Sequence, residues 1–443
     1  MGVTNLKVKP TEVHKTLSRY MMVDGFDLVL DLEKSKGSRV YDSRRGKYFL
    51  DCFSFFATSP IGCNHSKLTT PEFIKYLGKI SVNNPTNSDL YTVEMAEFVE
   101  AFNKYAMPDY FHHLFFISGG ALAVENGLKT AFDWKIRKNL EKGLGDKLGT
   151  QAIHFKEAFH GRTGYTLSMT NTFNLNKIKY FTKFYWPRIT NPKIKFPLNK
   201  ENLEEVKKLE IQALSEIEDA ISKNTDDISC LIIEPIQGEG GDNHFRKEFF
   251  LELRKICNNH DILFIVDEIQ SGVGLTGKMW AYQHFDFKPD ILAFGKKTQV
   301  CGIMVGKKVD EIKDNVFNVS SRLNSTWGGN LIDMVRCKKY LEIIDEEKLI
   351  KNAELEGKHL LKGLEHIAAK YPIISNARGR GLMCAFDLPT PEKRDEIKNK
   401  LYSNNLIVLG CGAKTIRFRP PLNISSEEID EALSIVDKIA KSS

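Results

Sequence analysis

The sequence predicts an α/β protein with a large domain built on a mostly parallel sheet and a second, smaller α/β domain. Nearly continuous apolar runs of strand length alternate with segments of helical periodicity over roughly residues 75–330, as in sheets that are buried on both faces. After Gly329 the pattern changes to long helical segments and short strands. A chain of 443 residues, with 42% hydrophobic and 27% charged residues, is long enough to form two such domains.

The order of these patterns divides the chain into three parts. Residues 76–330 are expected to form the large domain, and residues 331–443 the C-terminal small domain. Residues 20–65 carry two short strand signals, RVYD and YFLDCF, which fit either domain. We assign residues 1–75 to the small domain, so that both ends of the chain would build it.

The large domain is expected to alternate strands with helices. The predicted strands are His113–Ile117, Ala152–Phe155, Cys230–Ile233, Leu263–Val266 and Asp290–Phe294. The predicted helices are Ala121–Arg137, Asn202–Lys223 and Phe249–Asn259. Such alternation is typical of a doubly wound parallel sheet with helices on its faces.

The small domain is expected to begin with one long helix with charged faces, over Ile332–Lys370. Short strands follow in the segments GLMCAFDL, LIVLG and TIRFRP. The last helix, Ser425–Ala440, begins with SSEEID, in which a serine precedes acidic residues as in a capping box.

Composition and charge exclude several classes of function. The net charge of +6 (63 Lys+Arg minus 57 Asp+Glu) is small and interspersed, so no nucleic-acid partner is expected. No apolar window is long enough for a membrane span, and no secretory signal is evident, so neither a membrane nor export is expected. The eight cysteines form no CxxC or Cys/His cluster, so we expect buried thiols, no metal site and a cytoplasmic protein.

A glycine-containing turn, Ser118-Gly119-Gly120-Ala121, lies between an expected strand and an expected helix. Glycine lets the backbone approach a ligand closely, and a helix N-terminus offers free N–H groups to an anion. The turn is therefore either a phosphate-binding loop or an ordinary connection. It lacks GxGxxG and GxxxxGK[ST], which disfavours dinucleotides and Walker-type nucleotide binding.

Two charged residues follow expected strands at the edge where open α/β sheets bind ligands. Asp267 follows Leu263–Val266 and could either bind Mg²⁺ or hold a protonated ring nitrogen. Lys296 lies 29 residues further on, after the next strand, which is enough for one strand–helix–strand crossover. Apolar surroundings there would favour its neutral, nucleophilic form.

One cofactor needs all three features. Pyridoxal 5′-phosphate requires an anion-binding loop, an acidic partner for its ring nitrogen and a lysine that forms a Schiff base. Phe159, in AFHGR, is available to stack on the ring. Each residue alone has another explanation, such as an ordinary turn or a Mg²⁺ site. The combination of the three favours a pyridoxal-phosphate enzyme.

The sequence resembles the class III pyridoxal-phosphate aminotransferases from about Val23 to Pro421. The resemblance rests on SGGALAVENGLK, AFHGR, IIEPIQGEGG, FIVDEIQSGVGLTG, PDILAFGKK and IRFRPPL. Within this family the chain is most similar to the L-lysine 6-aminotransferases, through VDGFDLVLDL, PTNSDLYTVEMAEFVE, GGALAVENGLKTAFDWK, FGKKTQVCGIM and SRLNSTWGGNLIDMVR. Leu275 stands where many class III members have arginine, which supports this subgroup.

The resemblance implies a type I aminotransferase-like fold and a role for each site residue. Lys296 is expected to bond to the cofactor, with Lys297 as the alternative, and Asp267 to bind the ring nitrogen. The remaining cofactor contacts are assigned to Gly120 and Ala121 at the phosphate, Phe159 at the ring, Gln270 near the phenolic oxygen, and Thr326 reaching the phosphate of the partner subunit in a homodimer. The substrate contacts are assigned to Arg162, Arg417 and Gln270. Glu239 is also placed in the substrate site, where it is expected to pair with Arg417.

The reaction implied by the resemblance is transfer of the ε-amino group of L-lysine to 2-oxoglutarate. The products would be L-glutamate and 2-aminoadipate 6-semialdehyde, which cyclises to piperideine-6-carboxylate. The first alternative is another ω-aminotransferase that uses ornithine or 4-aminobutyrate. The second is a non-catalytic binding protein that keeps the fold, which the combination of Lys296, Asp267 and Gln270 disfavours.

Overall fold

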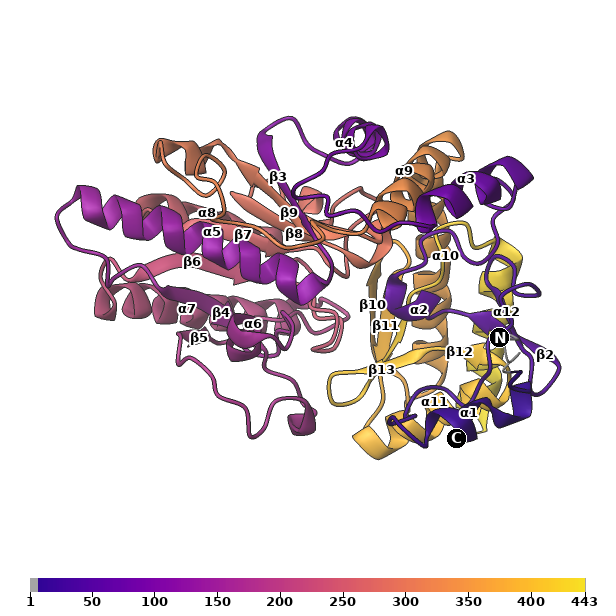
Figure 1. The fold of residues 1–443 in the computed structure, drawn as a ribbon. Helices are drawn as coiled ribbons and strands as arrows, with labels where there is room; N and C mark the ends of the chain where they lie inside the picture. The colour runs from indigo at the N-terminus through magenta and orange to yellow at the C-terminus, as the bar shows by residue number, and fades with distance from the viewer. Residues whose placement is uncertain (1–6, 443) are drawn as a thin grey trace.

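The computed structural model describes residues 7–442, so the first six residues of the assigned N-terminal part lie outside it. A seven-stranded sheet with helices on both faces forms the larger body, and smaller sheets with long helices form the other (Figure 1). This confirms the predicted α/β fold class. The division of the chain at residues 75 and 330 stays a prediction.

The central sheet has the strand order β3-β9-β8-β7-β6-β4-β5. Its strands are β3 (Phe111–Ile117), β4 (Gln151–Phe155), β5 (Arg188–Ile189), β6 (Ile228–Ile233), β7 (Leu263–Asp267), β8 (Ile291–Phe294) and β9 (Cys301–Gly306). Strands β5, β4, β6, β7 and β8 run parallel, whereas β9 is antiparallel to both of its neighbours. The five predicted strands are confirmed; β5, of two residues, and β9 complete the sheet.

Both faces of the sheet are buried, which explains why its strands are almost uniformly apolar. In β7, Leu263 and Ile265 belong to the apolar cluster that includes helix α5 (Gly120–Glu141). Phe264 and Val266 belong to the opposite cluster, which includes α7 (Lys200–Lys223) and α8 (Lys247–Asn259). Alternate residues of one strand therefore face different helix layers.

The connection from β7 to β8 differs from the predicted crossover. Among the described residues it contains one short 3-10 helix, η3 (Ala281–His284), and no α-helix. Left-handed backbone at Val273, Gly274 and Gly277 turns the chain repeatedly and prevents a regular helix. The strand ends still lie side by side, because Asp267 is paired with Ala293.

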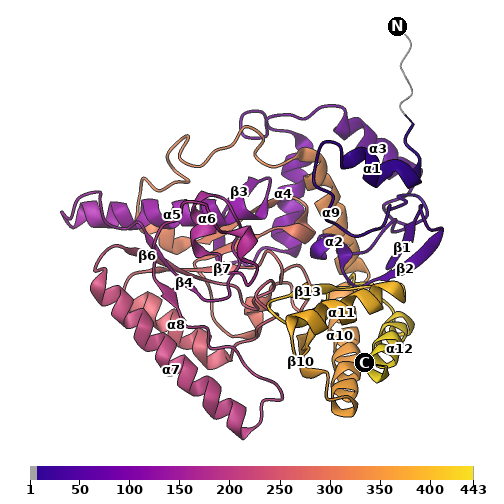
Figure 2. The ribbon, with the colours of Figure 1, turned by 90° about the horizontal axis from the view of Figure 1, so that it is seen from below.

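The second body contains two small sheets. One has the order β10-β11-β14-β13 and is antiparallel, with β10 (Ser375–Arg380), β11 (Met383–Asp387), β13 (Leu409–Cys411) and β14 (Thr415–Phe418). In the other, β1 (Arg39–Asp42) pairs with β2 (Lys47–Asp51), and β2 runs parallel to β12 (Leu406–Ile407). Figure 2 shows these N-terminal strands beside the C-terminal part of the chain. Residues from both chain ends thus share one sheet.

The helix predicted over 332–370 is wrong as a single element. Two helices occupy it, α9 (Leu331–Glu346) and α10 (Leu349–Lys370). Lys348 between them has a left-handed backbone with φ of 54°, which a continuing α-helix cannot contain. Helix α9 can then pack along α4 (Val93–Tyr105), while α10 packs against β10 and α12 (Ser426–Lys441).

The other helices lie at the chain ends and in connections: α1 (Val13–Leu17), α2 (Ser54–Ala57), α3 (Pro71–Ser81), α6 (Gly164–Met169), α11 (Pro391–Ser403) and α12 (Ser426–Lys441). The predicted capping box of α12 is confirmed, because Ser425 and Glu428 bond to each other's backbone N–H groups. Across residues 7–442, no helix combines the length and apolar character needed to cross a bilayer.

Candidate active site

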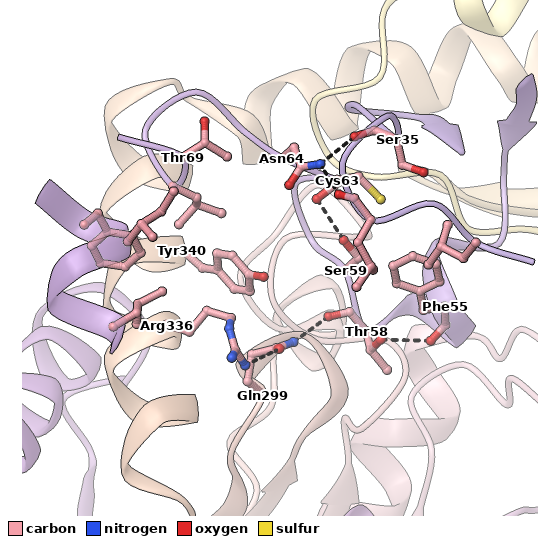
Figure 3. Close-up of a pocket in the computed structure, with 17 residues that line it drawn as sticks. Ser35, Phe55, Thr58, Ser59, Cys63, Asn64, Thr69, Gln299, Arg336 and Tyr340 are labelled. Carbon is pink, nitrogen blue, oxygen red and sulfur yellow. Dashed lines mark hydrogen bonds between the residues drawn. The ribbon is translucent and has the colours of Figure 1, made fainter. Parts of the chain in front are cut away.

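A cavity of about 790 Å³ lies where the carboxyl ends of β7 and β8 meet the start of α5. Seven of the predicted site residues line it: Gly120, Ala121, Phe159, Arg162, Asp267, Gln270 and Lys296. A second cavity of about 550 Å³ shares Thr58 and Gln299 with it. Figure 3 shows this second cavity, in which Gln299 donates to the Thr58 carbonyl and accepts from Arg336.

The turn before α5 has the geometry of an anion-binding loop. Gly119 has φ of 112°, a conformation that favours glycine, and it places the first turn of α5 at the cavity. A Cβ atom on Gly161 would lie 2.5 Å from the Cβ of Ala121. The neighbouring loop can therefore approach this helix start only because residue 161 has no side chain.

Asp267 ends β7 and is held by a histidine from another loop. His160 Nδ1 lies 2.8 Å from Asp267 Oδ2, and the Ile269 N–H donates to Oδ1 at 3.1 Å. Both side chains are buried. His160 is absent from the predicted site residues, although its AFHGR motif also contains Phe159 and Arg162. Its contact with Asp267 makes it a positioning residue for the carboxylate.

The two lysines of the FGKK segment face different surroundings. Lys296 lines the cavity, and burial together with the positive charge of Arg417 lowers its pKa to about 8. Lys297 is buried and its Nζ donates to the Gln270 carbonyl at 2.8 Å. Burial also lowers the pKa of Lys297. Only Lys296 therefore presents a reactive amine to the cavity, which favours it over Lys297.

Glu234 is a further site residue that sequence reasoning missed. Its carboxylate accepts from the N–H of Phe159 at 2.9 Å and from the N–H of Gly238 at 3.0 Å. Burial raises the pKa of Glu234. The carboxyl group therefore joins the loop that carries Phe159 to the loop that carries Glu239. Glu234 begins the motif EPIQGEGG, and this position was the one sequence feature that could have indicated its role.

The predicted substrate residues occupy three different environments. Arg162 is exposed at the cavity, while Arg417, on β14, is buried and donates from Nη1 to Gln270 Oε1 at 3.2 Å. Glu239 does not form the predicted pair with Arg417 among the described residues. Its Oε1 instead accepts from Lys177 Nζ at 2.5 Å and from Thr172 Oγ1 at 2.8 Å. These two donors hold the carboxylate on the side of Lys177 in this conformation, and the pairing with Arg417 stays a prediction.

Thr326 does not line the cavity of its own chain. It is exposed, and its carbonyl accepts from Ser88 Oγ at 3.2 Å. Nearby Trp327 and Tyr91 are also exposed, at 46% and 79% of their surface. A contact of Thr326 with a phosphate would have to be made in another subunit.

Pyridoxal 5′-phosphate fits this set of residues. N–H groups at Gly120 suit its phosphate, and Phe159 borders the space for a ring. Asp267 is buried and lines the cavity, so its carboxylate would give a protonated ring nitrogen an ionic partner. Lys296 supplies an amine with a lowered pKa. The fold and the cavity define a pyridoxal-phosphate-dependent transferase.

Comparison with known proteins gives the family. The family described as aminotransferase class-III matches residues 20–440, and the chain belongs to this family. It is 51% identical over 429 residues to the L-lysine-epsilon aminotransferase of Mycobacterium tuberculosis, covering 96% of this chain and 95% of that protein. The enzyme of the same name from Streptomyces clavuligerus is 47% identical, over 95% and 92% of the two chains.

A solved structure agrees with these relatives. Lysine aminotransferase from M. tuberculosis, in the internal aldimine form, superimposes with a TM-score of 0.96 at 50% identity. The match covers 98% of this chain and 100% of that one. The chain is therefore a pyridoxal-phosphate-dependent aminotransferase.

Proposed function

We propose that this enzyme transfers the ε-amino group of L-lysine to 2-oxoglutarate, with formation of L-glutamate. The other product is 2-aminoadipate 6-semialdehyde, which cyclises to piperideine-6-carboxylate. The similarity to enzymes named for lysine ε-transamination, at 47–51% identity over nearly the whole chain, carries the choice of donor. The site adds Arg162, which lines the cavity, and Arg417, which bonds to the cavity residue Gln270; both can bind carboxylates of a substrate.

When bound, the cofactor would supply an electron sink that makes a C–H proton of the substrate easier to remove. The chain provides the groups around that event. Asp267, fixed by His160, would keep a proton on the ring nitrogen. N–H groups at Gly120 and Ala121 would hold the phosphate, and Phe159 would limit movement of the ring. The Lys296 amine, whose pKa is lowered to about 8, is placed to accept and return the substrate proton.

The two substrates make opposite demands on Arg417. Lysine reacting at its far end places an apolar methylene chain where the side carboxylate of glutamate later lies. An uncompensated arginine there is unfavourable for the first substrate and useful for the second. We propose that Glu239 neutralises Arg417 for lysine and moves away for 2-oxoglutarate, whose carboxylate then forms a bidentate pair. Arg162 would hold the α-carboxylate of lysine.

Replacing Glu239 by glutamine should separate the two half-reactions. With no negative charge to offset Arg417, single-turnover kcat/KM for lysine should fall about tenfold, which corresponds to about 1.4 kcal/mol. The value for 2-oxoglutarate should stay within about threefold. Stopped-flow absorbance with each substrate alone measures both. Glu252→Gln, on the exposed face of α8, is the control; unchanged discrimination in E239Q would contradict the proposed switch.

The test of the donor is a direct comparison. L-lysine, L-ornithine and 4-aminobutyrate are supplied separately with 2-oxoglutarate, and glutamate formation is measured. We expect lysine to give the highest kcat/KM. A preference for ornithine or 4-aminobutyrate would favour the alternative ω-aminotransferase activity.

We also propose that the enzyme is a cytoplasmic homodimer with shared active sites. Thr326 is exposed on its own chain and would complete the phosphate site of a partner subunit. The exposed apolar side chains Tyr91 and Trp327 suit a subunit interface. All eight cysteines are free thiols, as expected in a reducing compartment. Full activity after dilution to the monomer would contradict the shared site.

A further inference from the structure

The cationic partner of Glu239 in the structure is Lys177, which has no role in the proposed function. Lys177 ends the 3-10 helix η2 (Leu175–Lys177), and its Nζ lies 2.5 Å from Glu239 Oε1. Thr172 donates its hydroxyl to the same oxygen at 2.8 Å. The other oxygen, Oε2, is buried without a hydrogen-bond partner in the described structure. Glu239 is thus tethered through one oxygen on the side of Lys177.

Arg417 is correspondingly available in this conformation. Its Nη1 donates to Gln270, and its buried Nε has no partner within residues 7–442. Gly238 makes room for this arrangement, because a Cβ atom there would lie 2.5 Å from Gln270 Oε1. A guanidinium that bonds to the cavity residue Gln270 and keeps one N–H group unpaired is suited to a carboxylate from a ligand.

The backbone around Glu239 is held firmly, so only its side chain can change partner. The Glu239 carbonyl accepts from the Gly412 N–H at 2.7 Å, which joins the loop to the turn between β13 and β14. Arg378 Nε donates to the Asp242 carbonyl at 2.9 Å, and Arg419 forms a buried ion pair with Asp242. Because β14 also carries Arg417, the distance between the two backbones is fixed by the fold.

We infer that Lys177 is a positioning residue that holds Glu239 away from Arg417 during the half-reaction with a dicarboxylate. This inference rests on the proposed function, in which the distal carboxylate of 2-oxoglutarate binds Arg417. Glu239 then has two positions, one on Arg417 and one on Lys177. A dicarboxylate binds only those molecules in which Glu239 contacts Lys177. Its apparent affinity therefore falls as the fraction of molecules with Glu239 on Arg417 rises.

The Lys177 position is suited to reversible release. Its side chain is 33% exposed, compared with 16% for Glu239, and its Nζ lies 5.7 Å from the centroid of the Phe159 ring. Partly exposed ion pairs of this kind are worth about 1 kcal/mol or less, so both positions of Glu239 stay accessible. Lys177 therefore shifts the balance between the two substrates without fixing it.

The experiment measures binding of glutarate, a dicarboxylate that has no keto group and no amino group and therefore cannot react with the cofactor. Isothermal titration of the cofactor-loaded enzyme should give about fivefold weaker glutarate binding for Lys177→Met than for the parent. Lys177→Arg should restore binding, because it keeps the cation. Lys179→Met, which removes a cation located over the neighbouring Tyr180 ring, is the matched control and should behave like the parent.

The outcomes separate this inference from the function on which it rests. In the Glu239→Gln background, Lys177→Met should have no further effect, since no carboxylate remains to be held. Equal glutarate affinity in the parent and in K177M would overturn the role of Lys177 while leaving the proposed function intact. A parent enzyme that does not bind glutarate would overturn both. Pentanoate, which lacks the second carboxylate, should bind the parent and K177M equally.

Discussion

Replacing Lys296 by alanine is expected to lower the rate of amino transfer by a factor of about 10³ or more, with the fold intact. The cavity contains this amine in a setting that lowers its pKa to about 8, so we expect it to supply both the bond to the cofactor and the group that moves the proton. The variant should still bind pyridoxal phosphate without a covalent bond, through Asp267 and the start of α5.

Mass spectrometry after borohydride reduction tests this prediction directly. The parent chain should gain the mass of the reduced cofactor, and K296A should not. Lys297→Met is the matched control, because Lys297 bonds to the Gln270 carbonyl and its side chain does not line the cavity. Cofactor that remains covalently attached in K296A and is lost in K297M would transfer the role to Lys297.

Replacing Asp267 by asparagine is expected to lower kcat by about 10²- to 10³-fold. Asparagine preserves the shape of the side chain and a hydrogen bond to His160, but removes the negative charge that we propose keeps a ring nitrogen protonated. The electron sink is then weaker in every proton-transfer step, so both half-reactions should slow together. This differs from E239Q, in which only the lysine half-reaction should slow.

Single-turnover rates with lysine and with 2-oxoglutarate measure this effect. Glu268→Gln is the control, because Glu268 lies next in the chain but accepts from Ser271 Oγ and from the Tyr282 N–H instead of lining the cavity. Burial raises the pKa of Glu268 to about 7, so a neutral amide is tolerable there. An Asp267→Asn enzyme with parental rates would show that another group holds the ring nitrogen.

The parts of the site that follow from strand order could be predicted from the sequence. Asp267 and Lys296 each follow a buried apolar run, and carboxyl ends of parallel strands meet at one edge of a sheet. Gly120 and Ala121 follow from the same reasoning at the start of α5. The expected α-helical crossover between β7 and β8 was unnecessary, because a chain of turns spans the same gap.

Other features depend on contacts that no local pattern encodes. Glu239 is paired with Lys177, which lies 62 residues away in the sequence. This pairing also depends on which way the Glu239 side chain points, and no local pattern gives that. The break at Lys348 has no glycine or proline to mark it, and arises because α9 and α10 pack against different neighbours. His160 lay within a recognised motif, but its contact with Asp267 required the relative placement of two strands.

The central claim is that this cavity removes nitrogen from the far end of lysine. The most direct test supplies L-lysine labelled with ¹⁵N at the ε position, together with unlabelled 2-oxoglutarate, and analyses the glutamate formed. We expect glutamate that carries the label, with a cyclic imine as the second product. Unlabelled glutamate, together with label transfer from lysine carrying ¹⁵N at the α position, would contradict it.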